Sequence, residues 1–425
     1  MLKSLHLENV GPSDSLGPID FSSRLNFVTG DNGLGKSFIL DIAWWSLTRN
    51  WARKSPAIPT VSLRKSKPTI SFAYTKQTRG DYSDAISFDR SQQIWPTKAG
   101  RPPIPGIVIY AGVDGSFSVW DPARNYWREK EAQLNRPSSF DFTPSQVWNG
   151  LRSEDGTLFC KGLIQDWVLW QQSEDPAFAD LRKVLKVLSP SEEEALSPGR
   201  PVRLGIDVTD HPSLVMPYGK TVALTLASAG MKRICALAYL LVWAWREHQA
   251  ASKQLGKSPA REIILLIDEV ECHLHPQWQR RIIPALLEVM KSLAGKKIPV
   301  QIIAATHSPL VLASAEPIFD EENDSIFTLD LHQNTVSITE RAYHLQGSVS
   351  NWLVSEAFGL QQARSIQAER AIEAAEAWMR GERGSLPSGL DSFQNIQSSL
   401  LKVLRGGDEF WPRWLIETDQ GPKKR

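Results

Sequence analysis

The glycine-rich run Gly30-Asp31-Asn32-Gly33-Leu34-Gly35-Lys36-Ser37 constrains this chain more than any other feature. It matches the pattern G-x-x-x-x-G-K-[ST] in full. Glycines in such a loop let backbone N–H groups turn inward around an anion, and a helix that begins there adds the positive end of its dipole. An apolar run at 25–29 precedes the loop, and residues 38–49 place apolar side chains at helical spacing. The sequence therefore predicts a strand, a phosphate-binding loop and a helix in succession.

The two residues that end this loop have separate expected roles. We expect the Lys36 ammonium to reach the β- and γ-phosphates of a nucleotide, and the Ser37 hydroxyl to bind Mg²⁺. The other loop residues are expected to surround the phosphates with backbone N–H groups: Gly30, Asp31, Asn32, Gly33, Leu34 and Gly35. The loop thus predicts ATP and Mg²⁺ as ligands.

A second motif, an acidic pair, ends the apolar run 263–267. An aspartate at the carboxyl end of a buried parallel strand lies at the rim where ligands bind, so Asp268 is placed to hold the Mg²⁺ shell. Glu269, one residue on, points in another direction and is placed to orient or deprotonate the attacking water. Together with the upstream loop, the pair predicts hydrolysis of ATP rather than binding alone.

A histidine follows the next apolar run, 300–305, within the sequence Thr306-His307-Ser308-Pro309. In that position its ring can hydrogen-bond the γ-phosphate and respond to the loss of that phosphate. We therefore expect Glu269, His307 and Lys36 as catalytic residues, and Ser37 with Asp268 as the metal ligands.

The fourth motif is a helix start. Ser228, Ala229 and Gly230 precede a long apolar helical pattern. A serine and small residues at the start of a helix can form an anion site. By itself the pattern is typical of an ordinary helix N-cap.

The apolar runs 263–267 and 300–305, with a helical pattern at 277–293 between them, define the expected fold. Strands that are so continuously apolar are covered on both faces, which indicates an α/β fold with a mostly parallel sheet flanked by helices. Residues 51–125 are rich in proline, glycine and serine, with short strand-like runs such as 107–110. We interpret this stretch as an antiparallel β lobe inserted after the first helix.

Changes of pattern along the chain divide it into four expected parts. Residues 1–125 are expected to form an N-terminal lobe with the phosphate loop and the β insertion, and 126–215 an inserted helical region. Residues 216–345 are expected to form a C-terminal lobe with the helix-start motif, the acidic pair and the histidine. Residues 346–425 are expected to form a C-terminal helical extension.

Taken in this order, the four motifs resemble the nucleotide-binding domains of the ABC ATPase class. In that class the serine-glycine signature of one subunit closes on the γ-phosphate held by another, so the resemblance implies a head-to-tail homodimer or a higher oligomer. The class usually has Leu-Ser-Gly-Gly at the signature, whereas this chain has Ala227-Ser228-Ala229-Gly230. The Gln loop of the class has two candidates here, Gln92 and Gln93.

Within the class, the resemblance is to the soluble branch that includes RecF-like proteins, the ATPase half of OLD-family nucleases and the PtuA-like ATPases of bacterial anti-phage systems. It rests on residues 1–50 and 220–315, which include Leu274-His275-Pro276 shortly after the acidic pair. The resemblance implies an ATPase that regulates a separate effector protein, a nuclease in a defence system. Two alternatives stay open: a DNA-repair ATPase that binds DNA directly, and the ATPase subunit of a transporter, against which the long stretch between loop and signature argues.

Composition and charge argue against several other classes. A net charge of +1 indicates no overall field toward DNA or membranes, and three widely spaced cysteines fit a reducing cytoplasm. The apolar segment 234–245 is shorter than the about 20 residues that span a bilayer, so we expect a cytoplasmic protein with no membrane partner.

Three further patterns receive a structural interpretation. Cys272, His273 and His275 match no common zinc spacing. A mixture of basic and aromatic residues at 120–130 reads as an amphipathic surface segment, with nucleic-acid binding as the alternative. A group of acids is interpreted as a solvated loop rather than a nuclease centre: Asp320, Glu321, Glu322, Asp324 and Asp330.

Overall fold

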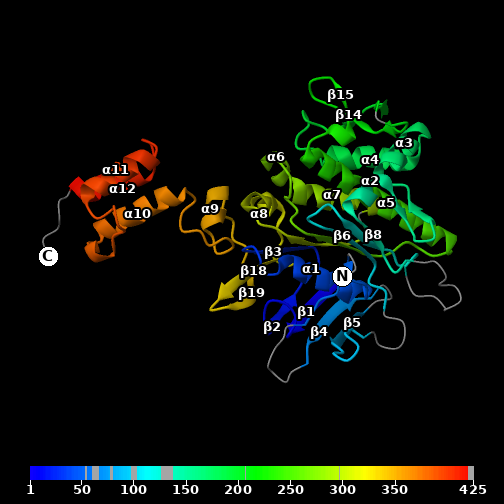
Figure 1. Ribbon diagram of the computed structural model, residues 1–425, viewed down its shortest axis with the longest axis horizontal. Coiled ribbons are helices and arrows are strands. Elements are labelled where there is room, and N and C mark those ends of the chain that lie inside the picture. The colour runs from blue at the N-terminus through cyan, green and yellow to red at the C-terminus, as the bar shows by residue number, and fades with distance from the viewer. Residues whose placement is uncertain are drawn as a thin grey trace. The chain divides into compact units, whose positions relative to one another are not determined.

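The computed structural model forms two compact units, Met1–Gly347 and Ser348–Arg425, which are described separately below (Figure 1). The structure describes residues 1–52, 55–59, 67–76, 80–96, 103–125, 137–205, 207–295 and 297–419.

An eight-stranded central sheet forms the base of the first unit. Its strands are β3 (Leu25–Gly30), β6 (Ile107–Ala111), β7 (Phe117–Trp120), β8 (Phe140–Phe142), β16 (Ile263–Ile267), β17 (Val300–Ala305), β18 (Asp324–His332) and β19 (Thr335–Arg341). Their order across the sheet is β19-β18-β3-β17-β16-β6-β7-β8. Neighbours from β18 to β6 run parallel, and the outer strands pair antiparallel. The expected mostly parallel α/β sheet is therefore confirmed.

The position of β6 differs from the expectation. We expected residues 107–110 in the antiparallel lobe, but β6 pairs in parallel with β16, with Ile107 opposite Ile263. All five residues of β6 are buried. A strand that is apolar on both faces must be covered on both, and the interior of the central sheet provides that cover.

The antiparallel lobe is a separate four-stranded sheet in the order β2-β1-β4-β5. Its strands are β1 (Leu2–Glu8), β2 (Ser15–Asp20), β4 (Thr69–Thr75) and β5 (Asp81–Ser87). Burial alternates along β4, where Ile70, Phe72 and Tyr74 are buried and the residues between them are partly exposed. One face of this sheet thus packs on the core and the other faces solvent.

The helix α1 (Lys36–Thr48), which follows β3, packs against both sheets (Figure 1). It contacts β1 of the lobe as well as β3, β6, β16 and β17 of the central sheet. Trp44 and Trp45, neighbours in sequence, are both buried; Trp44 packs on Tyr110 of β6, and Trp45 on Phe72 of β4. A helix that is apolar all round is held on every side, which fixes the loop at its N-terminus.

Other helices complete the first unit. They are α2 (Pro144–Asn149), α3 (Leu163–Gln172), α4 (Pro176–Val187), α5 (Ala229–Gln254), α6 (Pro276–Gln279), α7 (Ile282–Ala294), α8 (Pro309–Ala315), and the 3-10 turns η3 (Leu224–Leu226) and η4 (Glu316–Ile318). The helix α7 packs on β17, and α5 and α4 pack on α7.

The helical pattern at 277–293 is divided into α6 and α7, contrary to the single helix that we expected. Pro284 is the third residue of α7. In a continuous helix its ring would clash with the carbonyl of Arg280, whereas a proline is tolerated in the first turn of a new helix. Trp278 fixes the break because its indole N–H donates to the Leu188 carbonyl oxygen at 2.9 Å.

The region expected to be an inserted helical region holds α2, α3 and α4, and short strand pairs as well. These strands are β9 (Leu151–Arg152), β10 (Leu158–Cys160), β11 (Ser197–Pro198), β12 (Val202–Arg203), β13 (Asp210–His211) and β14 (Ser213–Val215), with β15 (Thr221–Ala223) following. In addition, β8 joins the edge of the central sheet.

The second unit is helical. It contains α9 (Val349–Val354), α10 (Ile366–Met379), the 3-10 turn η5 (Arg383–Ser385), α11 (Phe393–Val403) and α12 (Phe410–Asp419). Its core joins the alanine-rich face of α10 to Ile396, Leu400 and Trp414. None of the helices in the described part of the chain has both the length and the apolarity that a bilayer crossing requires.

A buried amide joins the central sheet to the antiparallel lobe. Gln301 of β17 is fully buried, and its side-chain oxygen accepts from the Leu2 backbone N at 2.8 Å. Its amide nitrogen donates to the carbonyl oxygens of Leu2 and Ser22, each at 2.8 Å. The two backbone groups of Leu2 thus depend on one side chain, whereas the Ser22 carbonyl oxygen also accepts from the Asn26 amide nitrogen.

We predict that Gln301→Leu lowers the free energy of unfolding by about 3 kcal/mol, because it leaves buried backbone groups without partners. Urea unfolding followed by circular dichroism measures the change. The control is Gln254→Leu at the exposed end of α5, which should change stability by less than about 0.5 kcal/mol. Equal effects of the two substitutions would contradict the role given to Gln301.

Candidate nucleotide-binding site

The loop at residues 30–37 leaves β3 and enters α1 with the backbone that only glycine adopts readily. Gly30, Gly33 and Gly35 have φ of +128°, +82° and +102°. A Cβ on Gly30 would lie 2.4 Å from the carbonyl oxygen of Leu329 in β18, so a side chain there would force the strands apart. Asp31 and Asn32, with Gly33, are exposed at the tip of the loop. The loop is therefore rigid at its base and open to solvent at its tip.

Lys36 lies across the inside of this loop. Its ammonium donates to the carbonyl oxygens of Gly30 and Asp31 at 2.8 and 2.7 Å, and only 6% of the residue is exposed. Burial lowers the pKa of Lys36, and the nearby carboxylates, Glu269 first among them, oppose that shift. A partly desolvated ammonium forms stronger hydrogen bonds with a charged acceptor such as a phosphate than with these neutral carbonyls.

Ser37 and Asp268 meet although they are 231 positions apart in sequence. The Ser37 hydroxyl donates to Oδ1 of Asp268 at 2.9 Å, and Asp268 is 1% exposed. The contact follows from the sheet, because β3, β17 and β16 are parallel neighbours and their carboxyl ends share one edge. A hydroxyl and a carboxylate side by side are hard oxygen donors of the kind that Mg²⁺ binds, so these two residues fit the expected metal site.

Glu269 and His307 lie beside each other at the same edge. The Nε2 atom of His307 is 3.9 Å from Oε1 of Glu269, and the two side chains are 29% and 37% exposed. Glu269 has a left-handed backbone, with φ of +48°, which is uncommon for a residue other than glycine. Burial, followed by the charge of Lys36, lowers the pKa of His307, which favours the neutral ring near pH 7.

Glu271 is a site residue that the sequence analysis did not single out. Its Oε2 accepts from the Thr306 hydroxyl at 2.7 Å, and its Oε1 accepts from the backbone N of His307. Burial raises the pKa of Glu271, and these two donors oppose the rise. The carboxylate thus ties the turn after β16 to the turn after β17, and it positions His307 opposite Glu269. No spacing in the sequence indicates this contact, because Glu271 and Thr306 are 35 positions apart in the chain.

Arg233 is a second residue that the sequence reasoning did not single out. It lies on α5, its Nη1 donates to the Val113 carbonyl oxygen at 3.4 Å, and burial lowers its pKa. Among the charges that oppose the shift are those of Asp268 and Glu269. A cation on the helix of the signature motif therefore belongs to the electrostatic surroundings of the acidic pair.

The motif Ser228-Ala229-Gly230 lies at the N-terminus of α5. Ser228 caps the helix, and its hydroxyl accepts from the Met231 backbone N at 3.3 Å. Ser228 and Ala229 are exposed, and Leu226 just before them is 68% exposed. Gly230 is buried against the His273 carbonyl oxygen, 2.8 Å from where a Cβ would be, so the glycine is required by packing within the chain. In the described part of the chain, the Ser228 hydroxyl bonds to its own helix and not to the loop at 30–37.

Several weaker candidates have local roles. Gln92 and Gln93 lie in an exposed turn after β5, where the Gln93 amide donates to the Arg90 carbonyl oxygen at 2.7 Å. His275 caps α6 through its Nδ1 atom. No group of three potential metal ligands of the His, Cys, Asp and Glu types occurs among the described residues.

The basic and acidic segments that the sequence analysis considered also have different surroundings in the structure. Arg124 pairs with Glu247, whereas Trp127, Arg128, Lys130 and the basic tail at 423–425 lie outside the described residues. Asp324 is buried and pairs with Arg24, and Asp320 accepts from Asn323 in a turn. Asp324 thus has a structural role rather than the solvated one we expected for it.

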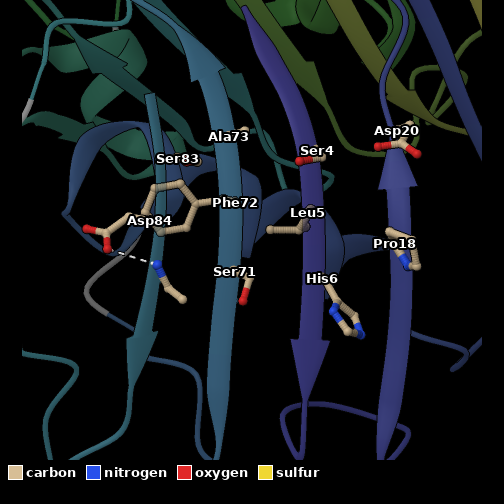
Figure 2. Close-up of a pocket in the computed structure, with 11 residues that line it drawn as sticks. Ser4, Leu5, His6, Pro18, Asp20, Ser71, Phe72, Ala73, Ser83 and Asp84 are labelled. Carbon is tan, nitrogen blue, oxygen red and sulfur yellow. Dashed lines mark hydrogen bonds between the residues drawn. The ribbon is translucent and has the colours of Figure 1, made fainter. Parts of the chain in front are cut away.

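A hollow of about 540 Å³ lies on the outer face of the antiparallel sheet. Figure 2 shows the residues that line it. Ser4, His6 and Ser71 point into it from β1 and β4. The imidazole of His6 lies 3.2 Å from the Ser15 hydroxyl. The lining also includes the carboxylates of Asp20 and Asp84 and contains no lysine or arginine among the residues that the structure describes, so it offers a phosphate no positive charge and we place the functional site at the loop 30–37.

We predict that Glu271→Ala lowers kcat for ATP turnover about 100-fold and changes KM less than about threefold, because His307 loses its position while Lys36 and Ser37 keep theirs. Steady-state phosphate release measures both constants. Glu271→Gln should restore part of the rate, since an amide oxygen can still accept one hydrogen bond. Glu288→Ala, on the exposed face of α7, is the control, and an unchanged kcat in Glu271→Ala would contradict the prediction.

Comparison with known proteins shows which sequences and structures this chain is similar to. A family model described as "AAA domain, putative AbiEii toxin, Type IV TA system" matches residues 121–313, and a second AAA domain model matches residues 4–99. The "Retron Ec83 probable ATPase" of Escherichia coli is 33% identical over 99 residues, which are 23% of this chain and 15% of that protein. The "Septu protein PtuA" of Bacillus thuringiensis is 29% identical over 115 residues, 26% of each chain. This chain thus spans about a quarter or less of the length of these curated relatives.

Solved structures are also similar. The SMC head domain from Thermotoga maritima has a TM-score of 0.41 at 17% identity and covers 80% of this chain and 99% of its own. The recombination mediator protein RecF has a TM-score of 0.38 at 12% identity and covers 80% and 98%. The two AAA domain models between them include the phosphate loop, the signature, the acidic pair and the histidine. The chain therefore carries ATPase domains of the AAA class.

Proposed function

We propose that this chain binds ATP with Mg²⁺ at the loop 30–37, hydrolyses it between two copies of the chain, and thereby regulates a separate effector, a nuclease in a prokaryotic anti-phage system. The observation that carries the proposal is that three motifs, the phosphate loop, the acidic pair and the histidine, meet at one sheet edge. Ser37 lies 2.9 Å from Asp268, and Glu269 lies 3.9 Å from His307.

Binding is assigned to the loop and its lysine. The backbone N–H groups of the loop and the N-terminus of α1 favour an anion, and Lys36 supplies a full positive charge. Ser37 and Asp268 would hold Mg²⁺, which neutralises phosphate charge in reactions of this type. These residues provide the affinity for the nucleotide, and their role requires no proton transfer.

Hydrolysis is assigned to Glu269 with His307. Glu269 is more than one-third exposed, so its carboxylate can reach a water molecule and orient or deprotonate it. A neutral His307 can donate a hydrogen bond to phosphate through one ring nitrogen while Glu271 fixes its backbone. Arg233 adds positive charge behind the acidic pair, where it stabilises two neighbouring carboxylates.

A second copy is assigned to complete the site. Ser228 and Ala229 are exposed at the start of a 26-residue helix, next to the exposed Leu226. Such a helix start offers N–H groups and a hydroxyl to an anion outside its own chain. This exposure supports a head-to-tail homodimer in which each signature meets the ATP of the other chain.

The effector is assigned from the relatives. Septu and retron proteins are the curated relatives whose ATPase segments match this chain, and the notion of a defence nuclease comes from the resemblance to such systems. The near-zero net charge of this chain also supports a protein effector over direct binding of DNA, which needs a basic surface.

We predict that Glu269→Gln lowers ATP turnover by at least about 100-fold and leaves ATP-bound dimers, because the water loses its base while the phosphate contacts remain. Turnover by phosphate release and mass by light scattering, each with ATP and Mg²⁺, measure the two effects. Lys36→Ala is the matched control, and it should lose nucleotide binding and stay monomeric. Full hydrolysis by Glu269→Gln would contradict the role of Glu269.

The same pair of variants tests the effector. Purified from its native cells with ATP, Glu269→Gln should retain a nuclease that Lys36→Ala does not. Capture of an integral membrane protein would contradict the effector assignment in favour of a transporter. ATP-dependent, salt-sensitive binding of DNA by the pure chain would contradict it in favour of a DNA-repair ATPase.

A further inference from the structure

A second hollow, of about 370 Å³, lies within the first unit at α3, the middle of α5 and the strand β10. No residue of the loop 30–37 lines it. Its volume is in the range of small-molecule pockets, about 300–1,000 Å³. Its lining includes aromatic rings and carboxylates beside other side chains, Lys161 among them: Phe159, Trp170, Trp243, Asp166, Asp175 and Glu247.

The most buried carboxylate in this lining is that of Asp166. Asp166 is 6% exposed, and its Oδ2 accepts from the Tyr239 hydroxyl at 2.7 Å. Among the described residues, this is the only side-chain hydrogen bond that the carboxylate receives, and no lysine or arginine among them lies within ion-pair distance of it. Burial raises the pKa of Asp166 to about 6, and the more distant charge of Lys161 offsets only part of that rise. A buried carboxylate with one neutral donor lacks the counter-charge that usually accompanies it.

The rings of the hollow are held in place by their neighbours. Trp243 is 4% exposed and meets Phe140 and Phe142 edge to face, at centroid distances of 5.7 and 5.4 Å. Trp170 packs on Tyr239 at 5.5 Å. Aromatic rings beside carboxylates attract an organic cation, because the ring faces and the carboxylates are both negative in potential.

The charges of the lining exclude the other ligand classes. Asp166, Asp175 and Glu247 are opposed by Lys161 in the lining and by Arg124, which pairs with Glu247. An anion would meet the Asp166 carboxylate at the bottom of the hollow. A neutral apolar ligand would cover that carboxylate and leave it without solvent or counter-charge. A cation supplies a counter-charge to the Asp166 carboxylate and is attracted by the aromatic rings.

We propose that this hollow binds an organic cation, a guanidinium or alkylammonium group, with its charge at Asp166 and Glu247 and its alkyl chain against Trp170 and Trp243. Free polyamines and the arginine or lysine side chains of a partner protein share this chemistry. Trp243 and Glu247 belong to α5, the helix that begins at Ser228, so the bound cation contacts the same helix that presents the signature.

The test uses the full chain labelled with 5-fluorotryptophan and followed by fluorine NMR. The probes are n-butylguanidine and n-butylurea, which match in shape and differ in charge. We expect n-butylguanidine to shift the resonances of Trp170 and Trp243 saturably, and n-butylurea to shift neither. Equal binding of the two probes, or no shift with either, would overturn the proposal.

Two variants locate the charge contact. Asp166→Asn keeps an oxygen for the Tyr239 hydroxyl and should weaken n-butylguanidine at least about 10-fold, and Glu247→Gln, at the partly exposed rim, should weaken it about threefold. Glu373→Gln, on the exposed face of α10, is the control and should leave affinity unchanged. Unchanged affinity in both Asp166→Asn and Glu247→Gln would overturn the proposal.

Further probes separate the two sources of the cation. Tighter binding of spermidine than of a glycine-flanked arginine peptide identifies a free polyamine as the ligand. Tighter binding of the arginine peptide, with loss of binding when citrulline replaces arginine, identifies the side chain of a partner. Failure of both probes to compete with n-butylguanidine would overturn the proposal. None of these measurements involves ATP, so they are independent of the proposed function.

Discussion

The hydrogen bond between Ser37 and Asp268 is the contact on which the rest of the site depends. It joins the first residues of α1 to the end of β16, and it exists because β3 and β16 are both parallel to β17 and end at one edge. Each apolar strand of this sheet is covered on both faces, so the strands cannot shift register without exposing their side chains. The core of the fold therefore determines the distance between a hydroxyl and a carboxylate, and those two groups are the proposed metal ligands.

Around that contact, most of the site residues are held in place by burial. The helix α1 is held between two sheets, and Gln301 supplies the hydrogen bonds that join those sheets. Lys36 and Glu271 are charged groups taken largely out of water, and each is held by neutral partners: two carbonyls for Lys36, and a hydroxyl with a backbone N–H for Glu271. Glu269 and His307, the residues proposed to act on water and phosphate, stay partly exposed. Buried, fixed groups such as Lys36 and Glu271 thus surround the two accessible side chains, Glu269 and His307.

Much of this arrangement follows from local sequence. The loop, Asp268 and His307 could be predicted because each follows an apolar strand, and parallel strands bring their ends together whatever their separation in sequence. The position of β6 could not be predicted, because a short apolar strand has the same sequence pattern in an antiparallel lobe and in a central sheet. The break before α7 follows from Pro284, which cannot lie inside a continuous helix. The apolar residues around it keep helical spacing on both sides of the break, so the pattern predicted a single helix. Glu271 and Arg233 act through contacts between distant segments, and no spacing rule indicates those.

The central claim is that the phosphate loop of one chain works with the signature of another, and mixing two inactive variants tests it most directly. Lys36→Ala removes the loop function, and Ser228→Arg blocks the exposed helix start, so each should be inactive alone. In a mixture, a dimer that carries one of each variant has one intact composite site of its two. The account predicts that mixing restores ATP turnover, to at most about half of the wild-type rate. Dimers that form on mixing and stay inactive, or full activity of Ser228→Arg alone, would contradict it.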